Sequence, residues 1–400
     1  MCDVTIIDAP CGAGKTSFAI EYMNNELFER FIYITPFISE LDRVINACNH
    51  RDFTQPNKVI GKGSKKKHFY DLLKEGDNIT STHSLFRSIS RDIIDTIKEM
   101  EYILILDEVC DVVENIDISK YDLNMLLTTN TIDVNDDNKV IWVNENYVGK
   151  FSYLKDSIKN GDVYLYNESM ILWTFPINIF KAFKHVYVMT YLFKAQIQAY
   201  YYDLNNLKYE YKSVENRNGK YELIDYKEIN GEKYKPLINV YEGNLNEIGN
   251  NKFALSKSWY IKANKKELMK TLNNNVVNYF KHIVKGKSKL NMWTTFQDYR
   301  TTLQGKGYTK GFVSCNARAT NDFKEKTNLA YLCNRYYNPV IKQFFIDKKV
   351  TINEDIWALS ELIQWMFRSA IRENKPINIY IPSERMRNLL QEWLGDKNND

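Results

Sequence analysis

Short apolar runs separated by amphipathic segments recur along the whole chain and predict alternating strands and helices. In the first half, residues 4–7, 31–35, 102–106 and 185–191 are such runs. They are rich in Ile, Val and Leu and carry few polar side chains, which is typical of strands buried on both faces of a parallel sheet. We therefore expect an α/β fold with mostly parallel sheets flanked by helices.

The alternation continues in the second half. Strands are expected at residues 290–294, 311–315, 329–333 and 377–381, and helices at 195–204, 265–285 and 354–372. Between the halves, two alternating runs in residues 209–226 flank Asn216-Arg217-Asn218-Gly219, which is a hairpin signal.

The length of 400 residues suits two domains of ordinary size. We expect a first domain over residues 1–204, a connector with the hairpin over 205–264, and a second domain over 265–400. Residues 116–162, between Glu108 and the strand at 185, are interpreted as an insertion of small helices and strands on the first domain.

Composition narrows the class of protein. Hydrophobic residues make up 44% and charged residues 26%, so a packed core is expected. The six cysteines are scattered without a C-x-x-C pair, which favours reduced thiols in a cytoplasmic protein over a disulfide framework or a zinc site. The net charge of +4 permits a polyanionic partner without requiring one.

The sequence does not predict a membrane segment. The longest apolar stretch free of charge, residues 169–180, is interrupted by Pro176 and is shorter than the roughly 20 residues that span a bilayer. The first expected strand begins almost at Met1, so no signal peptide is expected either.

A phosphate-binding loop is predicted where the first strand ends. The sequence A-P-C-G-A-G-K-T at residues 9–16 follows that strand and opens a helix. Glycines let backbone N–H groups approach phosphates, and the start of the helix adds partial positive charge. Lys15 would reach the β- and γ-phosphates of ATP, and the Thr16 hydroxyl would bind Mg²⁺. The candidate nucleotide-binding residues are Ala9, Pro10, Cys11, Gly12, Ala13, Gly14, Lys15, Thr16, Ser17 and Asp107.

Two adjacent carboxylates are candidates for the steps that such a loop cannot perform, namely binding of Mg²⁺ and activation of water. Asp107 and Glu108 directly follow the strand at 102–106. Asp107 would hold Mg²⁺, and Glu108 would orient and deprotonate the attacking water.

The order of these segments resembles the core of superfamily 2 helicases, and the closest general likeness is to compact helicases encoded by bacteriophages. Ala9 stands where the general loop motif has glycine, which is the variant seen in that superfamily, and D-E-V-C at 107–110 matches its D-E-x-x box. The resemblance implies two RecA-like domains with the ATP site in the cleft between them.

The same resemblance implies that Gln364, Arg368 and Arg372 act in catalysis with Lys15 and Glu108. The family motif is Gln-x-x-Gly-Arg-x-x-Arg, whereas here Phe367 replaces the glycine and the last arginine is one residue late. On a continuous helix, Arg368 and Arg372 would share one face and meet a γ-phosphate. The alternative is a solvated basic face.

The resemblance also assigns contacts with nucleic acid to turns at strand ends. Thr190 is followed by Tyr-Leu where the family has Ala-Thr, and residues 318–322 lack the glycine usual in the fifth motif. An ordinary strand-to-helix turn remains the alternative for Thr35 and Pro36, and a hydrogen-bonded turn residue remains the alternative for His83. The lysine-rich residues 62–68 are either a phosphate-contacting loop or solvated surface. The candidate nucleic-acid-binding residues are Thr35, Pro36, Thr82, His83, Thr190, Arg318, Thr320 and Asn321.

These observations together predict an ATP- and Mg²⁺-dependent helicase or translocase, with DNA favoured over RNA, acting in phage replication or recombination in the host cytoplasm. A packaging-type motor ATPase and a P-loop ATPase switch that does not translocate are the alternatives. The sequence does not predict the oligomeric state or the polarity of movement.

Overall fold

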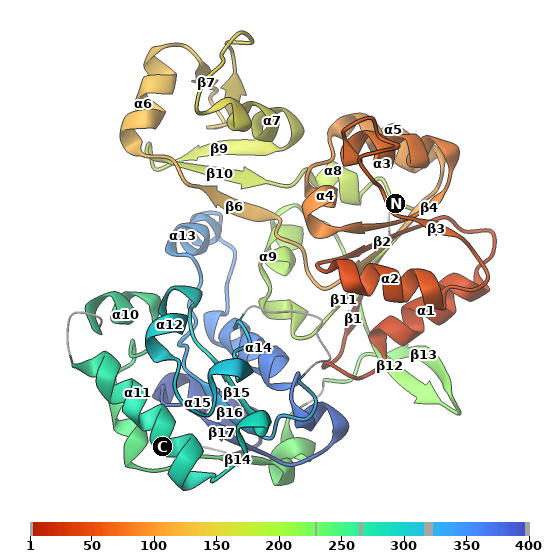
Figure 1. Cartoon of the computed structure of the whole chain (residues 1–400). Coiled ribbons are helices and arrows are strands. Elements are labelled where there is room, and N and C mark those ends of the chain that lie inside the picture. The colour runs from red at the N-terminus through yellow and green to blue at the C-terminus, as the bar shows by residue number, and fades with distance from the viewer. Residues whose placement is uncertain (1–2, 229, 264–266, 316–322, 397–400) are drawn as a thin grey trace. The chain divides into compact units, whose positions relative to one another are not determined.

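The computed structural model describes residues 3–228, 230–263, 267–315 and 323–396 (Figure 1). The chain divides into two units. The first unit consists of Met1–Ala9, Gly14–Tyr226 and Asn338–Ile352, and the second of Pro10–Ala13, Lys227–Tyr337 and Asn353–Asp400. Each unit contains a sheet with mostly parallel strands flanked by helices, which confirms the predicted fold class.

The first unit is built on an eight-stranded sheet with the order β13-β12-β1-β11-β5-β2-β4-β3. All neighbouring strands are parallel except the antiparallel pair β12–β13. The strands are β1 (Asp3–Asp8), β2 (Phe31–Thr35), β3 (Phe53–Thr54), β4 (Asn78–Thr82), β5 (Ile103–Asp107), β11 (His185–Thr190), β12 (Glu210–Arg217) and β13 (Lys220–Asp225). The four apolar runs of the first half are therefore confirmed as strands.

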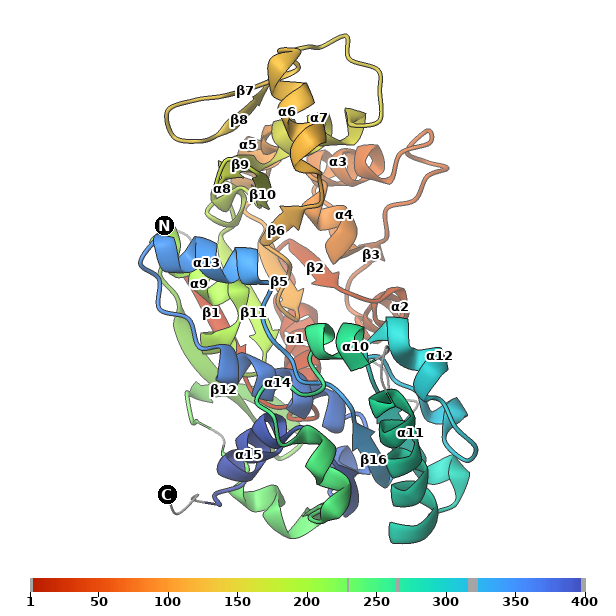
Figure 2. The same cartoon turned by 90° about the vertical axis from the view of Figure 1, so that its left-hand side faces the viewer.

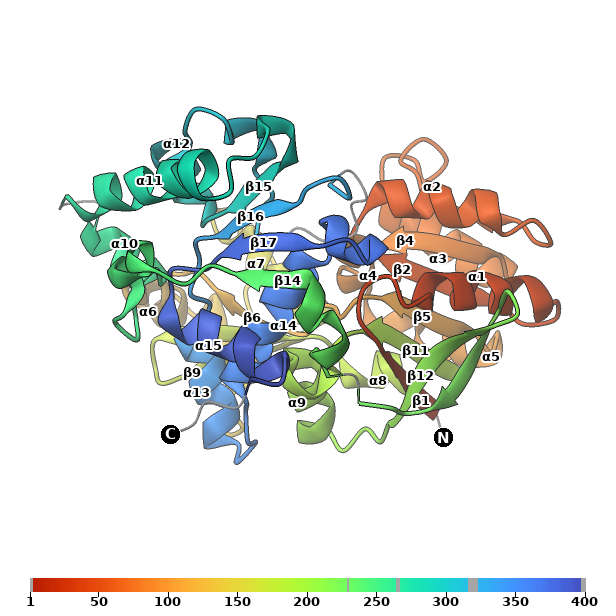
Figure 3. The same ribbon diagram turned by 90° about the horizontal axis from the view of Figure 1, so that it is seen from below.

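Helices cover this sheet, with α1 and α2 on one side and α9 on the opposite side (Figure 3). Met23 of α1 and Leu41 of α2 pack with Tyr33 and Ile105 of the sheet in one apolar cluster. The helices of the first unit outside the middle region are α1 (Lys15–Asn25), α2 (Ile38–Ala47), α3 (Lys65–Glu75), α4 (His83–Arg87), α5 (Ile94–Glu99), α8 (Ile177–Phe180), α9 (Ile197–Leu204) and α13 (Pro339–Asp347), with 3₁₀ turns at Arg91–Ile93 and Phe193–Ala195.

A middle region, residues 113–174, leaves the large sheet after β5 and returns before β11 (Figure 2). It has an antiparallel sheet with the order β6-β10-β9 and a separate hairpin, β7–β8. Val113 pairs with Thr174, so the region is wider than the predicted insertion of residues 116–162. Its elements are β6 (Val113–Ile116), α6 (Lys120–Thr128), β7 (Ile132–Val134), β8 (Val140–Trp142), α7 (Ser152–Asn160), β9 (Asp162–Tyr166) and β10 (Met170–Thr174).

The second unit contains a four-stranded parallel sheet with the order β14-β17-β16-β15. Its strands are β14 (Ile238–Val240), β15 (Asn291–Thr294), β16 (Asn328–Tyr331) and β17 (Ile377–Tyr380). Its helices are α10 (Lys257–Ala263), α11 (Leu268–Asn278), α12 (Arg300–Leu303), α14 (Glu354–Met366) and α15 (Glu384–Trp393), and a π-helical turn, Tyr279–Ile283, follows α11. Shorter 3₁₀ turns lie at Glu232–Leu237, Asn244–Gly249, Ser288–Leu290, Gln297–Tyr299, Thr309–Gly311 and Ala370–Glu373. Trp293, Tyr260 and Leu272 belong to its apolar core.

Two predicted elements have a different structure. The hairpin β12–β13 was expected in the connector, yet β12 pairs with β1 and extends the large sheet. Residues 311–315 were expected to form a strand, but Phe312 makes only an isolated bridge to Trp293. A 3₁₀ turn occupies Thr309–Gly311 instead, and Gly311 lies so close to β15 that a Cβ on it would be 2.1 Å from the Asn291 carbonyl oxygen.

Candidate nucleotide site at the edge of the large sheet

The predicted phosphate loop connects the end of β1 to the start of α1. Gly12 and Gly14 have φ angles of 86° and 100°, which L side chains rarely adopt. At Gly14 the space is also closed, because a Cβ there would lie 2.1 Å from Cε1 of Tyr221 on β13. The backbone N–H of Ala13 donates to the Pro10 carbonyl at 3.2 Å. The local sequence thus forms a tight turn directly before a helix.

Lys15 is the first residue of α1, and its side chain is buried. Its ammonium donates to the carbonyl oxygen of Ala9, and the N–H of Ala9 donates to the Thr190 carbonyl at 3.0 Å. The start of the loop is therefore bonded to β11, and the Lys15 side chain folds back over the loop.

Asp8, the last residue of β1, was not among the predicted site residues. Its carboxylate accepts hydrogen bonds from the N–H groups of Leu192 and Phe193 at 2.8 and 2.9 Å. Burial raises the pKa of Asp8, while these bonds and the nearby Lys15 act in the opposite direction. Asp8 holds the turn after β11 against the phosphate loop, and its place at the end of an apolar strand was the available sequence signal.

Strand β11 lies between β1 and β5 and is parallel to both. In register, Asp8 is opposite Thr190, and Met189 is opposite Asp107. The phosphate loop, Thr190 and the two carboxylates therefore leave the sheet at the same edge. Ligands of open parallel sheets bind at this edge, beyond the carboxyl ends of the strands.

Asp107 ends β5, and its side chain is buried. The Tyr33 hydroxyl donates to Oδ2 of Asp107 at 2.7 Å. Burial raises the pKa of Asp107 to about 6, with Glu108 adding to the rise, while the bond from Tyr33 and the Lys15 ammonium lower it. A bound cation favours the ionised form of such a carboxyl group. Tyr33 was read only as part of an apolar strand, so its contact with Asp107 was missed.

Glu108 adopts a φ of 82°, which is rare for a residue with a side chain. Its N–H donates to the Met189 carbonyl at 2.9 Å, and its Oε2 accepts a 3.1 Å hydrogen bond from the Thr190 hydroxyl. The carboxylate is half-buried. Left-handed backbone of this kind persists where surrounding contacts enforce it and is frequent at functional sites.

The donor set at this edge fits a magnesium–nucleotide complex. Mg²⁺ is usually held by one or two protein oxygens together with water and substrate phosphates. Thr16, in the first turn of α1, and Asp107 offer a hydroxyl and a carboxylate of this kind. Among the residues that the structure describes, no group of three or more His, Cys, Asp or Glu side chains is suited to hold a metal ion alone.

The other strand ends carry the predicted nucleic-acid contacts. Thr35 ends β2 and pairs in register with Thr82 of β4, so both lie at the same edge of the sheet. The Thr35 side chain is fully buried, and a contact there would use the half-buried Pro36 or the backbone. Thr82 caps α4 by accepting from the Leu85 N–H at 3.4 Å, and His83 is the first residue of that helix.

The side chain of Thr190 is fully buried and bonded to Glu108, which does not fit the predicted direct contact with nucleic acid. The predicted lysine loop is also partly helical. Residues 65–67 form the first turn of α3, and Ser64 caps it by accepting from the Lys67 N–H at 3.2 Å. Arg318, Thr320 and Asn321 lie outside the described residues.

The predicted continuous helix over residues 354–372 is wrong. Helix α14 ends at Met366. Beyond it, Phe367 packs edge-on against Tyr234, with ring centroids 4.8 Å apart, and the Ala370 N–H donates to the Lys326 carbonyl rather than to the helix. Arg368 and Arg372 therefore do not share a helix face. Their exposure differs as well, since Arg368 is 6% exposed and Arg372 is exposed.

Gln364 remains on α14, and its side chain is buried. Its amide Nε2 has no hydrogen-bond acceptor among the residues that the structure describes. Buried polar atoms without a partner are rare in proteins. Where they occur, they often lie at sites that receive a ligand or a water molecule.

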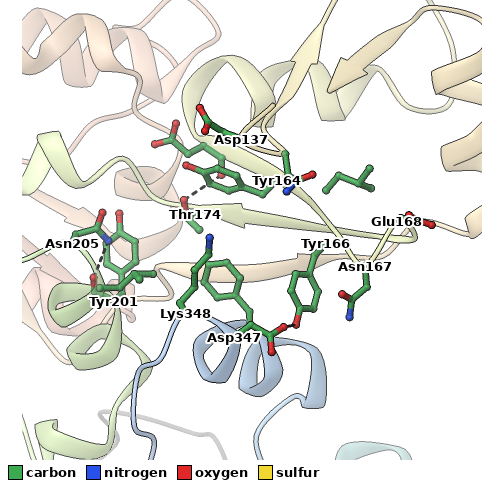
Figure 4. A pocket seen from close by; sticks show the side chains of 15 residues that line it. Asp137, Tyr164, Tyr166, Asn167, Glu168, Thr174, Tyr201, Asn205, Asp347 and Lys348 are labelled. Carbon is green, nitrogen blue, oxygen red and sulfur yellow. Dashed lines mark hydrogen bonds between the residues drawn. The ribbon is translucent and has the colours of Figure 1, made fainter. Parts of the chain in front are cut away.

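A separate cavity of about 500 Å³ lies in the first unit, where β9, α9 and α13 meet (Figure 4). Tyr166 donates to Asp347 across it, and Lys348 is the one lysine of its lining. The lining also includes the carboxylates of Asp137, Asp162 and Glu168. Since carboxylates outnumber basic groups, the cavity does not suit a phosphate.

Comparisons with known proteins follow the same division of the chain. A family profile described as the YonV middle domain matches residues 113–173, and one described as the YonV C-terminal Rossmann-like domain matches residues 232–394. A curated relative, the SPbeta prophage-derived uncharacterized protein YonV of Bacillus subtilis (strain 168), is 43% identical over 409 residues, which cover 98% of this chain and 99% of the relative. The chain belongs to the YonV family.

The YonV middle-domain match coincides with the region from β6 to β10, and the C-terminal match includes all four strands of the second sheet. A solved structure of S. tokodaii Xpd4 aligns with 99% of this chain and 95% of that chain, at 14% identity and a TM-score of 0.49. A similarity at this level assigns no activity. No helix within the described residues is long and apolar enough to cross a membrane.

Proposed function

We propose that this YonV-family protein is a Mg²⁺-dependent ATPase that acts on nucleic acid as a helicase or translocase of the superfamily 2 type. The observation that carries the proposal is the grouping of three features at the carboxyl ends of neighbouring strands in the large sheet. There the loop that ends in Lys15 and the pair Asp107 and Glu108 flank Thr190 of the intervening strand.

The residues at this edge divide the chemistry of phosphoryl transfer among them. Backbone N–H groups of the loop and the Lys15 ammonium would bind the phosphates, and Thr16 and Asp107 would hold Mg²⁺, whose positive charge would offset the negative charge of the phosphates. Glu108 orients the attacking water and accepts its proton. Thr190 fixes the Glu108 side chain, and Tyr33 fixes that of Asp107.

Nucleic acid is proposed as the partner because turns at the ends of β2 and β4 lie at the same edge as the nucleotide site. Lysines 65–67 at the start of α3 add positive charge to the first unit. Contacts of this kind bind phosphates rather than bases, so we propose little sequence preference and strong salt dependence. We propose DNA rather than RNA as the substrate. A role in phage replication or recombination is proposed because the relative is prophage-derived.

The test is the ATPase rate of the purified protein with and without single-stranded DNA, duplex DNA and RNA. The helicase or translocase proposal expects Mg²⁺-dependent hydrolysis that rises when one of these nucleic acids is added. Hydrolysis that is indifferent to all of them would favour a P-loop ATPase switch. Stimulation by duplex DNA alone would exclude a helicase that tracks on a single strand and would leave a duplex translocase or a packaging-type motor.

A further inference from the structure

Two cysteines that the proposed ATPase chemistry does not use lie side by side in the second unit. The thiols of Cys315 and Cys333 are in side-chain hydrogen-bond contact. The segments that carry them both bond to β15, since the Val313 N–H donates to the Trp293 carbonyl at 2.9 Å and the Leu332 N–H to the Thr294 carbonyl at 3.1 Å. The fold therefore brings both thiols together near the carboxyl end of β15.

A cation is fixed against one of the two thiols. Nη1 of Arg335 donates to the Cys315 sulfur at 3.0 Å, and Nη2 donates to Oε2 of Glu361 at 2.9 Å. The guanidinium also lies 5.3 Å from the ring centroid of Trp357. Glu361 is buried, so the arginine is held between the carboxylate and the sulfur.

The two thiols differ in reactivity. The hydrogen bond from Cys333 lowers the pKa of Cys315 to about 7, and Arg335 contributes in the same direction. Burial raises the pKa of Cys333 well above its usual range. The thiolate is the reactive form of cysteine, and a neighbouring cation stabilises it. Cys315, which is 7% exposed, is therefore the nucleophile of the pair, and the fully buried Cys333 is its neighbouring thiol.

We propose that Cys315 and Cys333 are an oxidation-sensitive pair that closes reversibly into a disulfide when hydrogen peroxide reaches Cys315. The Cys315 thiolate attacks one peroxide oxygen, the O–O bond breaks, and sulfenic acid forms while hydroxide takes up a proton to give water. The Cys333 sulfur then attacks the Cys315 sulfur, the S–S bond forms, and the S–O bond breaks. The leaving hydroxide takes the proton of Cys333 as water, so two thiols are oxidised and one peroxide is reduced.

This disulfide would join the segment after Phe312 to the segment after β16, across the end of β15. A dithiol reductant restores both thiols by exchange. The proposal does not rest on the nucleotide site, and it is independent of whether the protein hydrolyses ATP.

The test uses the full-length protein treated with hydrogen peroxide, blocked with N-ethylmaleimide under unfolding conditions and digested for mass spectrometry. The expected result is a peptide pair joined by Cys315 and Cys333 that dithiothreitol removes. Cys48 is the internal control, because it is also buried and burial raises its pKa to about 11. Cys315 should be oxidised at least about tenfold faster than Cys48, since far more of it is thiolate near neutral pH.

Two serine variants separate the roles of the thiols. Cys333→Ser should leave Cys315 as a sulfenic acid that dimedone labels, whereas Cys315→Ser should leave Cys333 unlabelled. Arg335→Lys should retain more of the oxidation rate than Arg335→Gln if the cation matters. A wild-type protein that keeps both thiols after peroxide, at a dose that oxidises free cysteine, overturns the proposal. So does oxidation of Cys315 no faster than that of Cys48.

Discussion

The Thr190 hydroxyl donates a 3.1 Å hydrogen bond to Oε2 of Glu108. The backbone of the same residue also contacts the phosphate loop, because its carbonyl accepts from the Ala9 N–H. One buried threonine thus joins the loop to the carboxylate that we propose as the general base. Strand β11 places it there because it runs between the strands that carry these two features.

Thr190→Val is expected to lower the kcat of ATP hydrolysis with little change in ATP affinity. The substitution removes the bond that orients Glu108 but leaves the loop backbone in place. Hydrogen bonds to charged groups contribute about 1.5–3 kcal/mol, so the loss should be on the order of tenfold to a hundredfold. Steady-state kinetics with the ATP dissociation constant measured separately distinguishes the two effects.

Thr80→Val is the matched control for this variant. Thr80 is also a fully buried threonine in the same sheet, and its hydroxyl has no hydrogen-bond partner among the described residues. The control should keep kcat near the wild-type value. Equal losses in the two variants would mean that Thr190 acts through packing rather than through Glu108.

Glu108→Gln and Lys15→Ala are expected to separate hydrolysis from binding. Glu108→Gln keeps the size of the side chain and removes the base, so ATP should remain bound without being hydrolysed. Lys15→Ala removes the ammonium that we propose binds the phosphates, so ATP affinity itself should fall. Equilibrium binding with a fluorescent ATP analogue and a phosphate-release assay measure both properties. Wild-type turnover in Glu108→Gln would remove that residue from the mechanism.

Gly14→Ala is expected to disrupt the phosphate loop, because the glycine combines a φ of 100° with a closed space beside Tyr221. Left-handed backbone costs about 1–2 kcal/mol for a residue with a Cβ, and the contact with Tyr221 adds to this cost. Gly219→Ala provides the control, since Gly219 has a φ of 89° but no atom within 4 Å of an added Cβ. Thermal unfolding and ATP affinity should both fall further in Gly14→Ala than in Gly219→Ala.

Substitution of Arg368 by alanine and substitution of Arg372 by alanine are expected to have different effects on stability and on kcat. Arg372 is exposed, so it is the arginine available for a bound phosphate, and its loss should lower kcat by on the order of 10³ if it acts as an arginine finger. Arg368 is buried, so its loss should mainly destabilise the fold, by about 1–3 kcal/mol. Thermal unfolding and kcat, measured for both variants, assign the roles. An unchanged kcat in Arg372→Ala would leave it as a solvated basic residue.

The sequence by itself determined four strands of the large sheet, β1, β2, β5 and β11, and the position of the glycine turn that we propose as a phosphate loop. Buried parallel strands need unbroken apolar runs, and a phosphate loop needs glycines directly before Lys and Thr. Both signals are local, so they can be read from neighbouring residues. The pair Asp107 and Glu108 was recognisable for the same reason, because it directly follows an apolar strand.

Only the tertiary structure decided which distant side chains meet. The contacts of Tyr33 with Asp107, Thr190 with Glu108 and Cys315 with Cys333 depend on strand order and on the segments that follow each strand. Helix α14 also ends at Met366, where the tertiary contacts of the following residues begin, although the local sequence favours a longer helix. Helical propensity contributes less than about 1 kcal/mol per residue, so tertiary contacts of buried side chains such as Phe367 can override it.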